Sequence, residues 1–196
     1  MSAASGYAAG QQAYAVFQNG EAVSVKDVEK NIKVLELAAQ TGCPVVTFYD
    51  SVGAKLAEGL DVLNAAAKLN ATIAKVSGVV PQVAVVLGVC GGTSALSAAN
   101  ADVCIMLRRR AVLHRSLHAA AKGDKVADAG SAAAAAKAGV AAIVPLTLPR
   151  LLRRLPTSWS AACQQPDRPG HLRVRAAHRC PERQRRACKG CCCPHR

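Results

Sequence analysis

Two valine-rich segments each run into a glycine-containing turn that opens a helical pattern, and this repeated unit constrains the fold more than any other feature. The first unit is Cys43-Pro-Val-Val-Thr-Phe-Tyr with the turn Asp50-Ser-Val-Gly-Ala-Lys. The second is the valine-rich segment at residues 82–87 with the turn Gly88-Val-Cys-Gly-Gly-Thr. Apolar strands without polar alternation are typical of a parallel sheet that is covered on both faces. The unit therefore predicts an α/β domain.

Helical and extended patterns alternate on either side of these units. A helix is expected to begin at Val25, with Ser24 as its N-cap, and to end at Thr41-Gly42. Further helices are expected over residues 56–75 and 94–99, and further strands over residues 14–18 and 102–107. This order of elements predicts a mainly parallel sheet with covering helices.

Both glycine turns place backbone N–H groups at the start of a helix. These groups have no acceptor within the helix, and the helix dipole favours negative charge at that end. An anionic oxygen is therefore stabilised there. Two such turns in one small domain predict two oxyanion sites.

Positive charge is concentrated in two parts of the chain, whose formal net charge is +13. Residues 145–196 hold twelve Lys and Arg against two acidic residues, and residues 108–118 hold four Arg against none. The rest holds nine basic and ten acidic residues. A basic chain can bind nucleic acid, but these arginines are not interleaved with aromatic residues. We therefore expect a folded domain over residues 1–144 and an irregular, solvated basic tail over 145–196.

Five segments carry a family resemblance because they occur together and in one order. They are Leu37-Ala-Ala-Gln-Thr-Gly-Cys-Pro-Val-Val, the turn with its helix start at residues 50–59, Ser77-Gly-Val-Val-Pro-Gln-Val, Gly88-Val-Cys-Gly-Gly-Thr, and Ala121-Lys-Gly-Asp-Lys-Val with Ala138-Gly-Val-Ala. With them, residues 14–144 resemble the carboxyltransferase subunits of biotin-dependent acyl-CoA carboxylases and decarboxylases. The resemblance implies their crotonase-like fold, a superhelix of repeated β-β-α units with a mainly parallel sheet.

The resemblance also implies an activity, the transfer of a carboxyl group between carboxybiotin and an acyl-CoA. The backbone N–H groups of Gly53 and Ala54 would stabilise the thioester enolate, and those of Gly91 and Gly92 the ureido oxygen of biotin. Neighbouring turn residues would contact substrate: Ser51, Val52, Cys90 and Thr93. The thiols of Cys43, Cys90 and Cys104 are expected to be packed rather than nucleophilic, because no histidine lies near them in sequence.

The partners implied by the resemblance are an acyl-CoA, a separate biotinyl carrier protein, and a second carboxyltransferase subunit or further copies of this chain. No metal is expected, because Cys188-Lys-Gly-Cys191 in the tail lacks a second ordered cysteine pair. A cytoplasmic location is expected, because the chain opens Met-Ser-Ala-Ala-Ser without the pattern of a secretory signal. No apolar run is long enough to cross a membrane.

The sequence departs from the family at several places. Val52 stands where a glycine is usual, Lys55 stands where arginine is common, and only residues 1–13 precede the first expected strand, so we expect part of the sheet to be missing. The basic segments at 108–118 and after 144 replace apolar and aromatic sequence. Suitable synonymous codons, read one base later, restore family-like sequence in both segments, which suggests a frameshift in the coding DNA.

Two other functions stay open on the residues alone. A crotonase-type hydratase or isomerase would need a carboxylate over the substrate, for which Glu58 is the candidate. A non-catalytic relative could instead use its basic tail to bind phosphate backbones.

Overall fold

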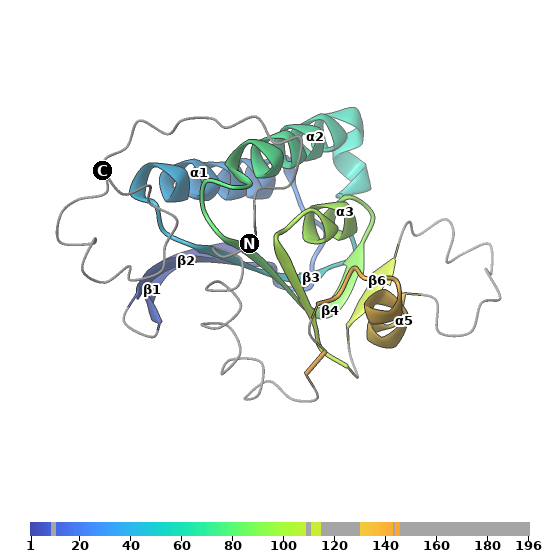
Figure 1. Cartoon of the computed structure of the whole chain (residues 1–196). Coiled ribbons are helices and arrows are strands. Elements are labelled where there is room, and N and C mark those ends of the chain that lie inside the picture. The colour runs from blue at the N-terminus through green and yellow to red at the C-terminus, as the bar shows by residue number, and fades with distance from the viewer. Residues whose placement is uncertain (9–10, 109–110, 115–129, 143, 146–196) are drawn as a thin grey trace.

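Six described strands form one sheet at the centre of the computed structural model (Figure 1). The structure describes residues 1–8, 11–108, 111–114, 130–142 and 144–145. The strand order is β1-β2-β3-β4-β5, with β6 also paired to β4. The strands are β1 (Ser2–Ala8), β2 (Gln11–Phe17), β3 (Val45–Ser51), β4 (Gln82–Gly91), β5 (Val103–Met106) and β6 (Val112–His114). All pairs are parallel except β1 with β2.

Helices pack on one face of this sheet. Figure 1 shows α1 (Val25–Thr41) and α2 (Gly59–Val76) side by side over the sheet, with α3 (Thr93–Ala99) close by. A short 3-10 turn, η1 (Leu56–Glu58), precedes α2, and α5 (Ala132–Lys137) packs beside β6. The predicted helices and parallel strands are confirmed, with ends shifted by a few residues. The sequence predicted no strand before residue 14, and β1 is found there.

The core lies between the helices and the sheet. One cluster joins Leu35 and Ala38 of α1 to Leu69 and Ile73 of α2, over Val45 of β3. The opposite face of the sheet is also apolar and buried, and its cluster contains Val46, Val83, Val85, Val103 and Ile105. Apolar side chains thus point to both faces of the central strands, as their lack of polar alternation predicts.

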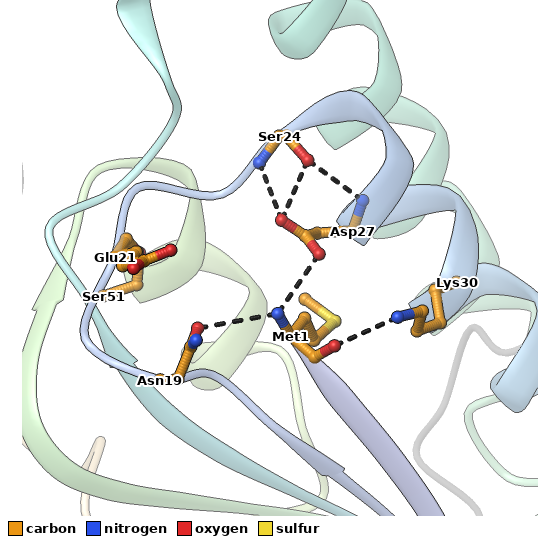
Figure 2. Close-up of polar contacts among 7 residues, drawn as sticks. All are labelled: Met1, Asn19, Glu21, Ser24, Asp27, Lys30 and Ser51. Atoms are coloured by element: carbon orange, nitrogen blue, oxygen red, sulfur yellow. Dashed lines mark hydrogen bonds and ion pairs between the residues drawn. The ribbon is translucent and has the colours of Figure 1, made fainter.

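A capping box fixes the start of α1 beside the N-terminus (Figure 2). The Ser24 hydroxyl accepts a hydrogen bond from the Asp27 N–H at 3.3 Å, and the Asp27 carboxylate accepts from the Ser24 N–H at 3.2 Å. The Met1 ammonium lies 3.2 Å from the other oxygen of Asp27. At the far end, Gly42 adopts the left-handed conformation, with φ of 70°, so the predicted cap and stop are both confirmed.

Replacing Ser24 with alanine is expected to lower the unfolding free energy by about 1 kcal/mol at neutral pH, the usual cost of losing such a cap. Burial alone would raise the pKa of Asp27, but hydrogen bonds from Ser24 and the nearby ammonium lower it overall. A lowered carboxyl pKa stabilises the fold above the unfolded-state pKa, and this contribution is lost as pH falls through the folded-state pKa. Urea unfolding of the wild type and of Ser24→Ala between pH 7 and pH 2 tests this. The difference between their unfolding free energies is expected to shrink as the pH falls and Asp27 becomes protonated. A difference that stays constant over this range would show that the Asp27 carboxylate takes no part in the cap.

Candidate active site

The two predicted glycine turns meet at the carboxyl ends of the neighbouring parallel strands β3 and β4. A Cβ built on Gly53 would lie 3.1 Å from the carbonyl oxygen of Gly91. A Cβ built on Gly91 would overlap the carbonyl oxygen of Val52 and lie 3.0 Å from its carbon. The backbones of the two turns are therefore in direct contact, and both contact positions require glycine.

The first turn is held by hydrogen bonds to the loop that precedes α1. The hydroxyl of Ser51 donates to the Glu21 carbonyl at 2.7 Å and accepts from the Gly53 N–H at 3.2 Å; Figure 2 labels Ser51 and Glu21. The Val23 N–H donates to the Gly53 carbonyl at 2.8 Å. The Gly53 N–H thus already has an acceptor, whereas the described residues supply none to the N–H of Ala54.

The second turn lies between the first turn and β6. Gly91 pairs in register with His114 of β6, a neighbour that was not predicted from the sequence. Gly92 forms the N-cap of α3 with φ of 54°, and a Cβ built there would meet no atom within 4 Å. The backbone at Gly92 is therefore open, in contrast to the tightly packed backbone at Gly91.

The four predicted substrate-contact residues divide by exposure. The side chains of Ser51 and Cys90 are buried, whereas Val52 is exposed and Thr93 is partly exposed. Burial is the main cause that raises the pKa of the Cys90 thiol, with Cys104 and Asp50 adding to it, and burial raises the pKa of Cys104 to about 11. Both thiols are therefore protonated at neutral pH. Any contact from Ser51 or Cys90 to a substrate would come from the backbone.

Glu58 has a structural role in this arrangement. Its carboxylate accepts a hydrogen bond from the Val25 N–H at 2.7 Å, at the start of α1, and lies 3.8 Å from the Lys55 ammonium. A carboxylate near a helix N-terminus is stabilised by the unpaired N–H groups there. This contact joins residues far apart in sequence, so spacing gave no sign of it.

Several predictions lie outside the described residues. They concern the segment at residues 121–126, most of the basic segment at 108–118, and the tail after residue 145, including its cysteines and the suggested frameshift. The boundary at 144 stays a prediction, as do the roles of the turn residues. In the described part of the chain, no helix combines the length and the apolar character needed to span a membrane.

Comparison with known proteins places these turns in a family. Residues 2–124, more than half of the chain, match the carboxyl transferase domain. The methylmalonyl-CoA carboxyltransferase 12S subunit of Propionibacterium freudenreichii subsp. shermanii is 42% identical over 90 residues, which are 46% of this chain and 16% of that protein. The chain thus spans about a sixth of the length of this curated relative.

Solved structures share the fold. A transcarboxylase 12S hexamer, with hydrolysed methylmalonyl-coenzyme A bound, matches with a TM-score of 0.67 and 31% identity over 74% of this chain and 30% of that chain. The β subunit of Pseudomonas aeruginosa geranyl-CoA carboxylase matches with a TM-score of 0.73 and 25% identity over 85% of this chain and 34% of that chain. The predicted crotonase-like α/β fold is confirmed, and the chain belongs to the carboxyl transferase domain family.

Proposed function

We propose that this chain is an acyl-CoA carboxyltransferase subunit, which moves a carboxyl group between biotin and the α-carbon of an acyl-CoA thioester. The observation that carries the proposal is the direct contact of the two glycine turns, which brings the backbones of the two predicted oxyanion sites to one end of the sheet. Membership of the carboxyl transferase domain family supports the reaction class.

The first turn would bind the thioester oxygen. In the decarboxylating direction, the bond between the α-carbon and the carboxyl group breaks, and its electron pair moves onto the thioester oxygen as an enolate. The carboxyl group would pass to a ureido nitrogen of biotin, and the proton that this nitrogen loses would return to the α-carbon. A backbone N–H aimed at this oxygen stabilises it, and losing one such donor costs roughly a hundredfold to a thousandfold in rate. The N–H of Ala54 is available. The N–H of Gly53 would give up its hydrogen bond to the Ser51 hydroxyl and donate to the enolate oxygen instead.

The second turn would bind the ureido oxygen of biotin through Gly91 and Gly92. The chain's residues fit this role, because the backbone at Gly92 carries no side chain and has open space beside it. When present on a carrier protein, biotin accepts or donates the carboxyl group. The chain covers 30% of the transcarboxylase 12S chain, a protein that assembles as a hexamer. We therefore include a second carboxyltransferase chain or further copies of this one among the proposed partners.

A matched pair of glycines tests the second turn. Gly92 and Gly59 each stand at a helix start with nearly the same backbone angles, φ 54° and ψ −122° against φ 57° and ψ −130°, and neither has an atom within 4 Å of a built Cβ. Alanine at either position is expected to lower the melting temperature equally, because the backbone strain is the same. Only Gly92→Ala is expected to slow carboxyl transfer from methylmalonyl-CoA to free biotin, by about tenfold or more, because the methyl group displaces the ligand.

Two results would count against this function. Equal losses of transfer in Gly92→Ala and Gly59→Ala would mean that the second turn acts only through stability. A wild-type chain that neither binds an acyl-CoA by calorimetry nor transfers its carboxyl group, with or without added biotinylated carrier, would reject the proposal.

A further inference from the structure

The pairing of β3 with β4 contains a bulge where the two glycine turns begin, at Asp50 and Gly88. Tyr49 pairs with Val86, but Ser51 pairs with Cys90. One residue of β3, Asp50, therefore lies opposite three residues of β4, at positions 87–89. Bulges of this kind change the direction of a strand and are over-represented next to active sites.

The Asp50 carboxylate covers the bulge at Gly88. A Cβ built on Gly88 would overlap one carboxylate oxygen and would lie 2.9 Å from the carboxyl carbon and 3.3 Å from the other oxygen. No side chain fits at position 88 while the carboxylate stays in place. The backbone of Asp50 is held as well, because its carbonyl accepts a hydrogen bond from the Gly20 N–H at 2.7 Å.

This bulge sets the alignment of the two turns. With regular pairing beyond Tyr49, Ser51 would pair with Gly88, and Gly91 would lie two residues, about 7 Å, further along the sheet. The two extra residues bring Gly91 back against Val52 and Gly53. Because a shift of two residues keeps every side chain on its own face, the core is unchanged and only the turns are realigned.

We propose that Asp50 and Gly88 are positioning residues that align the two glycine turns for carboxyl transfer. The inference rests on the proposed function. Asp50 acts through its shape, by filling the space above Gly88, and exchanges no proton. The consequence is that Asp50→Asn, which keeps this shape without the charge, retains both the transfer rate and its pH profile.

A double-mutant cycle on Gly88→Ala and Asp50→Ala tests the contact. Each single variant is expected to lower kcat for carboxyl transfer about tenfold to a hundredfold, because it moves one turn relative to the other. In the double variant, the alanine methyl group at position 88 fills the space left by the carboxylate, so kcat exceeds that of both single variants. Gly6→Ala in β1 is the control, because a Cβ there meets no atom within 4 Å, and it should transfer at the wild-type rate.

The unfolding free energies of the same variants provide a readout that does not depend on activity, since residues in contact show non-additive changes. If the wild type is active and the loss of kcat in the double variant is the product of the two single losses, this inference alone is overturned. Loss of activity in Asp50→Asn with a changed pH profile would also overturn it, because Asp50 would then exchange a proton. A wild-type chain without any transfer would instead reject the proposed function, and the positioning role with it.

Discussion

Replacing Gly91 with alanine is expected to lower carboxyl transfer about a hundredfold, because a displacement of about 1 Å in a catalytic arrangement has effects of this size. The added methyl group would overlap the carbonyl oxygen of Val52, which belongs to the backbone of the other turn. The two turns must then separate. Overpacking of this kind is also expected to cost about 1–3 kcal/mol of stability. Initial rates measured well below the melting temperature separate the two effects.

Gly88→Ala is the matched comparison for this prediction. Its methyl group also overlaps an oxygen, but that oxygen belongs to the Asp50 side chain, whereas the one at Gly91 belongs to the backbone, so less of the structure has to move. We therefore expect Gly88→Ala to cost less stability than Gly91→Ala. If Gly91→Ala kept the stability and the transfer rate of the wild type, the two turns would not be in contact, and the proposed site would lose its basis.

Replacing Leu69 with alanine is expected to lower the unfolding free energy by about 2–5 kcal/mol, the usual cost of truncating a buried leucine. Leu69 lies on the inner face of α2, is 6% exposed, and belongs to the core cluster shared with α1 and β3. The loss combines the lost transfer free energy of the side chain with the cavity that remains. Chemical denaturation followed by circular dichroism measures it.

Leu60 provides the control on the same helix, since it is 80% exposed. Leu60→Ala is expected to change stability by no more than about 0.5 kcal/mol, as is usual for surface substitutions. Similar effects of the two substitutions would contradict the packing of α2 against the sheet.

Local signals made much of the fold predictable. The limits of α1 follow from Ser24 and Gly42, whose capping roles need only the residues around them. The parallel order of β3, β4 and β5 follows from apolar runs separated by helical patterns. β1 was missed because its sequence, Ser-Ala-Ala-Ser-Gly-Tyr-Ala, lacks β-branched residues, and a strand of this kind is specified by its partner. β6 was missed because it is short and lies within an arginine-rich segment.

The candidate site was predictable in its parts but not in its alignment. The sequence identified both glycine turns, and the structure brings them together. The sequence alone could not reveal that the Ser51 hydroxyl accepts a hydrogen bond from the Gly53 N–H, because this bond depends on the rotamer of the Ser51 side chain. Nor could it reveal the extra residues opposite Asp50, because the register of two strands is set by tertiary packing.

The position of β1 has a consequence for the behaviour of the protein in concentrated solution. β1 lies at one end of the strand order, and in the described part of the chain it pairs with β2 alone. Its residues 2–7 are exposed and uncharged. Natural edge strands resist intermolecular pairing through charged side chains, prolines or bulges. β1 has none of these, so we expect this exposed edge to be a place where separate molecules can pair.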